Sequence, residues 1–266
     1  MPVYLMESET EGERIRQKTK KDVTLEHLNI AGLKKGMKAI DIGCASGEVT
    51  RTMAEITDNV VGFDCSVNRI EQAIQIDSKL GINNIKYVVG NAYKTRLEDN
   101  YYDFVWARFL FEYLGKKPLP VLQELKRITK PGGKVVVVDI DGNCVFHYPI
   151  DTELEKAIQE TVLIANKITG WDPYVGRKLY NFFYQTGFKD IKVDILPYNQ
   201  VIGEPSPEVY KLWEMKINTV KNAMKLLVPN MNEKYKNLPE EFLNQIKIMI
   251  KLSLSTFKFI IIIITT

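Results

Sequence analysis

The stretch that decides the fold is AIDIGCASGEVT, residues 39–50. Apolar residues on both sides of Asp41 predict a buried strand, and the small residues Gly43, Ala45 and Gly47 follow at every second position. A turn with so little side-chain volume lets a ligand approach the backbone amides closely. A helix is expected directly after this turn, so that its positive dipole end faces the turn. The stretch therefore predicts a strand–turn–helix unit with a ligand at the turn.

Short apolar strands alternate with helices along the first half of the chain. The expected strands are residues 38–43, 59–64, 85–90 and 102–108, and a fifth strand that follows a Pro-Gly-Gly turn and ends at residue 141. The expected helices are residues 48–56, 67–81 and 118–130. Such alternation predicts βαβ units and a mostly parallel sheet that is covered by helices on both faces. We therefore expect an α/β fold with a doubly wound sheet, in which ligands lie beyond the carboxyl ends of the strands.

The pattern changes after residue 141. Two further helices are expected at residues 151–170 and 176–188, and a strand is expected at 191–197. The last residues, 258–266, contain five consecutive isoleucines, which are β-branched and predict a strand buried inside the sheet. The expected division of the chain is a helical lead-in over 1–35, a core over 36–199 plus 252–266 with a helical insertion at about 145–175, and a helical lid over 200–251.

Composition argues against several classes of protein. The net charge of +3 is too small to indicate a nucleic-acid partner. Two histidines, and cysteines without a CxxC pair, argue against a zinc site, and the widely spaced thiols favour a reducing cytosol. The charged N-terminus does not resemble a signal peptide, and the apolar C-terminal run is too short to span a membrane. We expect a cytoplasmic protein with no metal and no membrane partner, and its oligomeric state stays open.

The charges around the glycine-containing turn distinguish two kinds of cofactor. A dinucleotide binds its pyrophosphate at a G-x-G-x-x-G turn, whereas this turn has only Gly43-x-x-x-Gly47. Glu48 at the start of the helix would also repel a diphosphate. A zwitterionic cofactor with an ammonium and a sulfonium fits better beside Asp41 and Glu48. Asp64 ends the next expected strand, where its carboxylate can accept hydrogen bonds from both hydroxyls of a ribose.

The spacing Asp41-x-Gly43-x-Ala45-x-Gly47 resembles the first motif of class I S-adenosylmethionine-dependent methyltransferases. Glycine is more frequent in that family where Ala45 stands, so the additional methyl group requires an ordinary backbone angle at this residue. Asp64 is similar to the family's second motif, an acid that binds the ribose. The resemblance therefore implies S-adenosylmethionine as the cofactor.

The segment VVGNAYKTRL, residues 88–97, resembles the third motif of the same family. That resemblance implies that Asn91 faces the adenine amino group and that the Ala92 amide reaches a ring nitrogen. The family usually has aspartate in place of Asn91, and an asparagine oxygen is still an acceptor. The alternative for Asn91 is a role in a turn or a helix cap.

The segment YYDFVWARFLFEYL, residues 101–114, resembles the fourth motif. By that resemblance Ala107 and Arg108 end a strand against the methionine arm of the cofactor, and Phe109 packs either near the cofactor or in the core. The implied cofactor site consists of Asp41, Gly43, Cys44, Ala45, Gly47, Asp64, Cys65, Asn91, Ala92, Ala107, Arg108 and Phe109. The resemblance covers residues 36–139 well. It implies a Rossmann-like methyltransferase fold with seven strands, the last strand lying antiparallel between the fifth and the sixth.

The implied activity is the transfer of a methyl group from S-adenosylmethionine to a small organic acceptor by in-line displacement. The protein then aligns the acceptor and excludes water, and a general base is needed only if the acceptor must lose a proton. His147, Asp139 and Glu112 follow expected strands and are catalytic candidates, each with a structural role as its alternative. The aromatic residues expected over the acceptor are Phe146, Tyr148, Trp171, Tyr174 and Trp213.

Two other functions stay open from the sequence. A protein that binds S-adenosylmethionine without catalysis, as a regulatory or partner-binding module, would carry the same cofactor motifs. An NAD-dependent oxidoreductase is the third hypothesis, and Glu48 and the missing third glycine argue against it. Nucleic-acid bases are disfavoured as acceptors, because ARFLFEY stands where enzymes that methylate their amino groups carry an N/D-P-P-Y/F motif.

Overall fold

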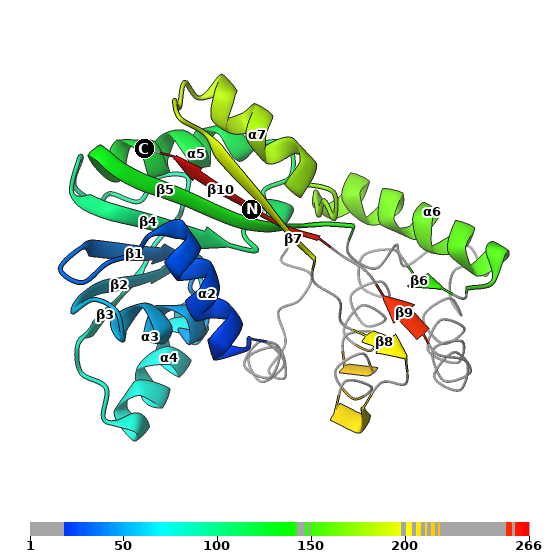
Figure 1. Ribbon diagram of the computed structural model, residues 1–266, viewed down its shortest axis with the longest axis horizontal. Helices are drawn as coiled ribbons and strands as arrows, with labels where there is room; N and C mark the ends of the chain where they lie inside the picture. Colours follow the sequence, from blue (N-terminus) through cyan, green and yellow to red (C-terminus); the bar gives the residue numbers. More distant parts are fainter. Residues whose placement is uncertain are drawn as a thin grey trace.

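A computed structural model describes residues 19–142, 147–148, 150–197, 201–203, 254–256 and 259–265, together with single positions between 206 and 218 (Figure 1). Its parallel strands are β1 (Lys38–Ile42), β2 (Asn59–Asp64), β3 (Ile85–Val89), β4 (Tyr102–Arg108) and β5 (Thr129–Asp141). They pair in the order β3-β2-β1-β4-β5. The predicted α/β fold with a mostly parallel sheet is therefore confirmed.

Two further strands, β7 (Lys192–Pro197) and β10 (Phe259–Thr265), extend the sheet beyond β5. The isoleucine run forms β10, which pairs antiparallel with β5 on one side and with β7 on the other. Ile262, for example, stands between Val138 and Asp194. β-branched residues favour such a position, because they pack well against neighbours on both sides of a pleated sheet.

Helices cover both faces of the sheet (Figure 1). The helices on one face are α2 (Lys21–Ala31), α3 (Glu48–Ala54) and α4 (Val67–Leu80), and those on the other face are α5 (Pro118–Ile128) and α7 (Gly176–Gln185). Phe104 and Trp106 of β4 pack in one core cluster with residues of α2 and α3. Val105 and Ala107 pack in the other, with residues of α5 and α7. Successive side chains of the strand thus enter opposite cores, as the period of a β-strand requires.

A long helix and a small sheet lie beyond the carboxyl ends of the parallel strands (Figure 1). The helix is α6 (Thr152–Thr169); it begins at Asp151, whose side chain accepts the Glu153 and Leu154 amides. It ends at Gly170, which has a left-handed backbone with φ of +79°. The small sheet is antiparallel and contains, in this order, β6 (His147–Tyr148), β9 (Leu254–Thr256) and β8 (Val201–Gly203).

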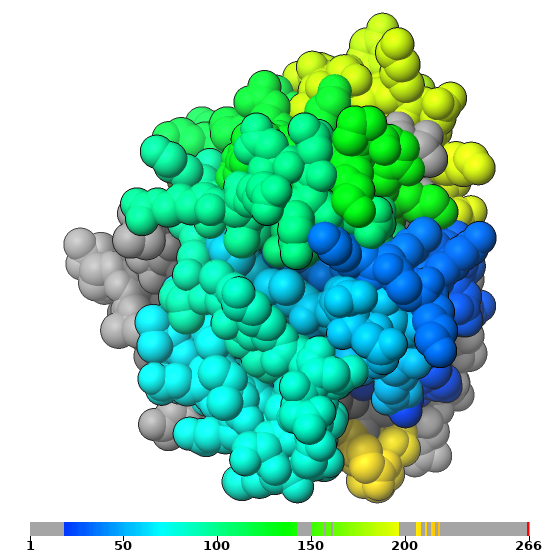
Figure 2. Space-filling view, turned by 90° about the vertical axis from the view of Figure 1, so that its left-hand side faces the viewer, coloured from blue at the N-terminus to red at the C-terminus, as the bar shows by residue number. Residues whose placement is uncertain are grey.

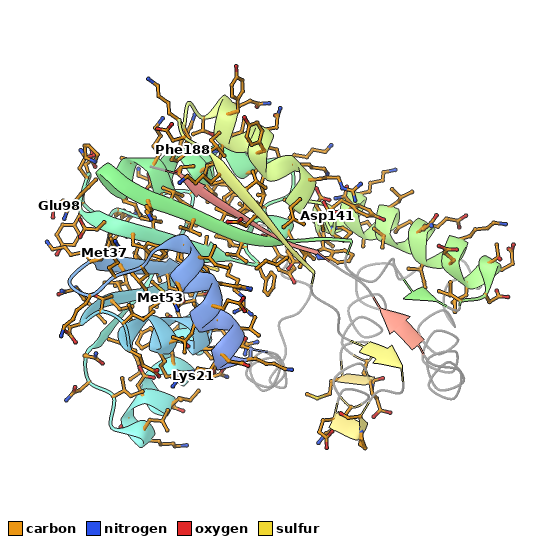
Figure 3. The ribbon with its side chains drawn as sticks, viewed as in Figure 1. Lys21, Met37, Met53, Glu98, Asp141 and Phe188 are labelled. Carbon is orange, nitrogen blue, oxygen red and sulfur yellow. The ribbon has the colours of Figure 1, made fainter. Side chains whose placement is uncertain are left out.

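The parallel strands begin at one edge of the main sheet and end at the other. Figure 2 shows the molecule from the edge at which they begin. Met37 and Glu98, which precede β1 and β4, lie at this amino-terminal edge, and Asp141, the last residue of β5, lies at the carboxyl-terminal edge (Figure 3). Doubly wound folds bind their ligands at the carboxyl-terminal edge. The candidate site is therefore built from the turns at that edge.

The predicted start of β5 is wrong. The Pro-Gly-Gly segment was expected to precede the strand, but β5 begins at Thr129, which pairs with Tyr102. The register of β5 against β4 shifts between Tyr102 and Phe104, and Gly132 has a left-handed φ of +77°. The segment is therefore an irregularity inside the strand rather than a turn before it. As a result, α5 ends at Ile128 instead of residue 130.

Candidate functional site

The glycine-containing turn after β1 is bound to the end of β2 through its backbone. The amides of Gly43 and Cys44 both donate to the Phe63 carbonyl, at N···O distances of 2.7 and 3.1 Å. The Gly47 amide donates to the Cys44 carbonyl at 2.9 Å and closes the turn. Gly43 and Gly47 have φ angles of +79° and +83°, which glycine adopts without strain. The path of the backbone thus requires glycine at both positions.

Ala45 has a left-handed backbone as well, with φ of +47°. An ordinary backbone angle, the condition under which the additional methyl group is tolerated, is therefore not met. The left-handed conformation costs an L-residue roughly 1–2 kcal/mol, because its Cβ crowds the following carbonyl oxygen. The Ala45 amide donates to Oδ2 of Asp64 at 2.9 Å, and this bond holds the turn in that conformation.

Asp64 lies directly against the turn, at the end of β2. Its Oδ2 accepts the Ala45 amide, and its Oδ1 accepts the Ser66 amide at 2.9 Å. A carboxylate has about four acceptor positions, so the Asp64 carboxylate can accept a further donor besides these amides. Burial raises the pKa of Asp64, while its bonds to the amides of Ser66 and Ala45 lower it. The side chain therefore suits a ligand with two neighbouring hydroxyl groups.

Asp41 is buried beneath the turn, and its carboxylate faces α3. Only 2% of the residue is exposed, and the Thr50 hydroxyl donates to its Oδ2 at 2.7 Å. Burial raises the pKa of Asp41 to about 7, although the Thr50 bond and the positive charge of Arg108 lower it. Asp41 thus joins β1 to α3, rather than standing open beside a ligand ammonium as the sequence suggested.

Three charged side chains form a buried ion network behind the turn. Arg51 of α3 lies 2.6 Å from Oε1 of Glu48 and 2.9 Å from Oδ1 of Asp77 in α4. The exposed fractions of the three side chains are 10%, 20% and 7%. We expected Glu48 to face the positive charge of a ligand, but Arg51 neutralises it instead. The i,i+3 spacing of Glu48 and Arg51 is a sequence signal for their pairing, whereas no local signal indicates Asp77.

Tyr87 of β3 fills the space beneath the turn. A Cβ atom on Gly47 would lie 2.4 Å from the Tyr87 hydroxyl oxygen, and one on Gly62 would lie 2.6 Å from the ring. Glycine at both positions therefore allows the turn and β2 to approach this ring. Burial and the nearby Asp77 raise the pKa of Tyr87, so the phenol stays protonated. No motif in the sequence singles out Tyr87.

Arg108 at the end of β4 faces helix α2. Its Nη1 donates to Oγ1 of Thr24 at 3.3 Å, and its guanidinium lies 4.8 Å from the centre of the Phe109 ring. His27 of α2 is buried nearby, and burial together with the charge of Arg108 lowers its pKa to about 4. Ala107, the preceding residue of β4, is fully buried in the core. Sequence reasoning missed Thr24 and His27, because the pattern of α2 does not distinguish residues near the site from core residues.

The remaining residues of the implied site follow β1, β2 and β3 and so lie at the same edge. Asn91 is exposed, and its Oδ1 accepts the Tyr93 amide at 2.9 Å, which is the turn role named as its alternative. Ala92 packs against the core. Cys44 is buried and Cys65 is exposed, and neither forms a disulfide with another described residue.

The carboxylates of the catalytic candidates Asp139 and Glu112 both accept hydrogen bonds from other groups of the protein. Oδ2 of Asp139 accepts the amides of Phe111 and Glu112 at 2.8 and 3.3 Å. Oε2 of Glu112 accepts the indole N–H of Trp171 at 2.8 Å. Burial and the charge of Glu112 raise the pKa of Asp139. These contacts favour the structural alternative for both residues.

The third catalytic candidate, His147, lies in β6, where its backbone pairs with Thr256. Nothing further is described of its side chain. Phe146 and Trp213 lie outside the described residues, as do residues 1–18 of the expected lead-in and most of the expected lid over 200–251.

Asp141, at the end of β5, is bound by the start of α7 (Figure 3). Its Oδ2 accepts the Arg177 amide at 2.7 Å, and the same carboxylate accepts the Arg177 guanidinium at 2.9–3.0 Å. A Cβ atom on Gly176 would lie 2.8 Å from the Ile140 carbonyl, so glycine permits this close approach. A carboxylate at a helix N-terminus is electrostatically favourable, and here it anchors α7 to β5.

A groove of about 340 Å³ lies at the opposite, amino-terminal edge, which Figure 2 faces. Its polar lining includes Lys38, Asp58, Asn59 and Lys86. None of the residues implied by the sequence motifs lines it. Within the described parts of the chain there is no cluster of potential metal ligands, and no helix is long and apolar enough to cross a membrane.

Residues 33–187 match a protein family described as "Methyltransferase domain". The chain belongs to this methyltransferase-domain family. The match begins just after α2 and extends past the end of α7, so it includes every turn of the candidate site. The resemblance to class I S-adenosylmethionine-dependent methyltransferases is thereby confirmed.

Curated relatives match about half of the chain. A demethylmenaquinone methyltransferase of Oceanobacillus iheyensis is 32% identical over 131 residues, which are 47% of this chain and 52% of that protein. Phosphoethanolamine N-methyltransferase 3 of Arabidopsis thaliana is 32% identical over 120 residues, which are 44% of this chain and 24% of that protein. This chain therefore spans about half the length, or less, of these relatives.

A solved structure shows the same fold. Haemonchus contortus phosphoethanolamine N-methyltransferase 2, in complex with phosphomonomethylethanolamine and S-adenosylhomocysteine, superposes with a TM-score of 0.57 at 17% sequence identity. The superposition covers 92% of this chain and 52% of that one. At this identity the likeness shows the Rossmann-like methyltransferase fold alone.

Proposed function

We propose that this protein binds S-adenosylmethionine and transfers its methyl group to a small organic acceptor. The observation that carries the proposal is the contact between Asp64 and the glycine-containing turn. The acid that ends β2 and the turn that follows β1 form one continuous polar edge, joined by the 2.9 Å bond from the Ala45 amide to Asp64. The family match over residues 33–187 supports the same function.

The chemistry of this edge suits the cofactor. The Asp64 carboxylate can accept hydrogen bonds beyond those from the Ala45 and Ser66 amides, as binding of a ribose requires. The nearest atoms to a Cβ added at Gly43 belong to Leu110, at 3.4–3.8 Å, so a methyl-sized group there would make only ordinary van der Waals contact. A cofactor with a ribose next to a small-residue turn is therefore compatible with the side chains present.

The positions of the other predicted residues at the carboxyl-terminal edge suggest a role for each of them. Asn91 has a second lone pair on Oδ1 beside its bond to Tyr93, and it would accept the adenine amino group. Arg108 would face the methionine end of the cofactor, and Asp41 acts indirectly by fixing α3 to β1. The residues that would contact the cofactor through backbone or packing are Gly43, Cys44, Ala45, Gly47, Cys65, Ala92 and Phe109, whereas Ala107 is fully buried and would support the end of β4 from the core.

The cofactor, when bound, supplies a methyl group on a sulfonium that is already an activated leaving group. The residues of this chain bind and orient it, align the acceptor, and exclude water. A general base is needed only if the acceptor must lose a proton. Asp139 and Glu112 already accept hydrogen bonds from protein donors, which disfavours both of them for this step.

A small acceptor is proposed because the relatives are named for demethylmenaquinone and phosphoethanolamine. α6 and the small sheet lie beyond the carboxyl-terminal edge, from which an acceptor would approach (Figure 1). We propose that the cofactor-binding core comprises residues 36–199 plus 252–266. The insertion at about 145–175 and the lid over 200–251 would cover the acceptor. A cytoplasmic location, where Cys44 and Cys65 would stay reduced, belongs to the same proposal.

Calorimetric titration with S-adenosylmethionine tests cofactor binding. We expect saturable binding to the wild-type protein and a loss of about tenfold or more in D64A, which removes both ribose acceptors. The matched control is D58N, which changes an exposed acid at the other edge and should leave the affinity unchanged. No binding at millimolar cofactor would overturn the proposal, and selective binding of NAD would favour the oxidoreductase.

Transfer of a labelled methyl group separates an enzyme from a non-catalytic module. The protein is incubated with methyl-labelled S-adenosylmethionine and acceptors of two chemical classes, a quinol and a phosphorylated amine. We expect label in one of them. Cofactor binding without transfer to either class would favour the non-catalytic binding module.

A further inference from the structure

Glu112 joins the turn after β4 to the end of α6. This turn is the short helix η1 (Phe111–Tyr113), and Glu112 within it is only 4% exposed. The Glu112 carboxylate accepts the Trp171 indole N–H at 2.8 Å, and its backbone carbonyl accepts the Asp172 amide at 2.8 Å. Trp171 and Asp172 directly follow Gly170, the residue that ends α6. Glu112 therefore holds the end of α6 through both its side chain and its backbone.

The turn after β4 also contacts the glycine-containing turn at the carboxyl-terminal edge of the sheet, where the cofactor is proposed to bind. Oδ2 of Asp139 accepts the Phe111 and Glu112 amides, which fixes the turn to β5. Leu110, one residue before η1, lies next to Gly43: its nearest atom would be 3.4 Å from a Cβ atom placed on that glycine. A displacement of η1 would therefore move Leu110 relative to the glycine-containing turn.

The end of α6 packs closely against the turn after β4. A Cβ atom on Gly170 would lie 2.7 Å from the Cα of Gly115, so the two backbones touch. The Asn166 side-chain amide donates to the Trp171 carbonyl at 2.8 Å. The last turn of α6 thus holds the backbone of Trp171, whose indole donates to Glu112.

We propose that Glu112 is a positioning residue that couples α6 to the cofactor edge through Trp171. It acts through other groups: its carboxylate holds the indole, the indole holds the end of α6, and the turn that carries Glu112 keeps Leu110 against the glycine-containing turn. The inference rests on the proposed function, because the coupling matters only if the cofactor binds at that turn. It assigns Glu112 a role other than that of a catalytic base.

Three variants test this coupling, with S-adenosylhomocysteine as the calorimetric probe. E112A removes the acceptor of the indole, and W171F keeps an aromatic ring but removes the donor. We expect each to weaken binding by about tenfold, within the roughly 2- to 30-fold range of such couplings. E112Q retains a side-chain oxygen that accepts the indole N–H, so its affinity should stay within about threefold of wild type.

A matched control separates positioning from stability. Glu124 of α5 is also largely buried, with a side chain 12% exposed that accepts from Thr95 and Arg127, at the amino-terminal side of the molecule. E124A should lower the melting temperature but change the affinity for S-adenosylhomocysteine by less than about twofold. In E112A and W171F, hydrogen exchange at the Asp172 amide should accelerate together with the loss of affinity.

The outcomes distinguish this inference from the function on which it rests. If the wild-type protein binds and E112A and W171F bind equally well, the coupling is wrong and the proposed function stands. An equal loss of affinity in E124A and E112A also overturns the coupling, because general destabilisation would explain both. If the wild-type protein binds no S-adenosylhomocysteine, the proposed function fails and takes the coupling with it.

Discussion

At the carboxyl-terminal edge of the main sheet, Arg51 holds Glu48 and Asp77 in an ion network in which no side chain is more than 20% exposed. At the amino-terminal edge, Lys130 and Asp103 form an ion pair at 2.6 Å whose side chains are 37% and 30% exposed. The two arrangements have similar distances and very different surroundings. Water reaches the second pair and is largely excluded from the first.

This difference in exposure indicates which of the two ion pairs contributes to the stability of the fold. When one partner of a buried pair is removed, the remaining charge has no water to replace it, and the loss of stability is large. When one partner of an exposed pair is removed, water solvates the other, and the pair contributes little. The buried network therefore orders the turn, α3 and α4 relative to one another, whereas the exposed pair has little influence on the fold.

Replacement of Arg51 by methionine should have the largest effect. R51M leaves the carboxylates of Glu48 and Asp77 without their cation, so we expect the free energy of unfolding to fall by about 3–5 kcal/mol. Because Arg51 lies directly behind the turn, cofactor affinity should fall as well. Urea denaturation followed by circular dichroism measures the first effect, and calorimetry measures the second.

The triple variant R51M/E48Q/D77N is the matched control for this prediction. It removes the cation and both anions, so no unpaired charge remains, and most of the lost stability should return. A loss below about 1 kcal/mol in R51M alone would place the network in the same class as exposed pairs and contradict the comparison.

Asp41 predicts a dependence of stability on pH. Its folded pKa of about 7 lies above its ordinary value of 3.8, so between these values the folded protein binds more protons than the unfolded chain. Its contribution to the free energy of unfolding therefore falls as the pH rises from about 4 to about 7. D41N removes this contribution. The free energy of unfolding of D41N, relative to that of wild type, should therefore rise by on the order of 3 kcal/mol across that pH range. Denaturant unfolding of both proteins at each pH gives the difference.

The difference between variant and wild type is the informative quantity, because other groups titrate in the same range. The folded pKa of His27, about 4, lies below its ordinary 6.5, so its contribution rises with pH. Asp64, whose pKa is raised by burial, acts in the same direction as Asp41. D58N, which changes an exposed acid, should run parallel to wild type. A parallel profile for D41N would show that the carboxyl group of Asp41 titrates normally.

The sequence predicts the cofactor edge better than the contacts behind it. The position of Asp64 follows from strand ends, because the carboxyl ends of neighbouring parallel strands meet at one edge. Arg51 and Asp77 are 26 residues apart, and Glu112 and Trp171 are 59 apart, so no local pattern indicates that they meet. Ala45 was misjudged because its backbone angle is set by the bond to Asp64 and not by its own preference.

Glycine at residue 45 should relieve strain in the turn. The left-handed backbone costs alanine roughly 1–2 kcal/mol, and the greater flexibility of an unfolded glycine costs roughly 0.5–1 kcal/mol, so A45G should gain about 0.5 kcal/mol. A54G, in the last residue of α3, is the matched control and should lose about 0.5–1 kcal/mol. Chemical denaturation measures both. A loss in A45G equal to that in A54G would mean that the turn carries no such strain.

The smallest effect is expected at the amino-terminal edge, in K130A. Water can replace Lys130 there, and Asp103 keeps the Lys38 amide as a donor at 2.8 Å, so its carboxylate stays partnered. We expect a loss of about 0.2–1 kcal/mol that shrinks in 1 M salt, where the screening length is about 3 Å. The loss in R51M should change little in the same salt series, because burial protects that network from mobile ions. If both losses respond to salt equally, exposure does not separate the two edges, and the buried network loses its special role in ordering the turn.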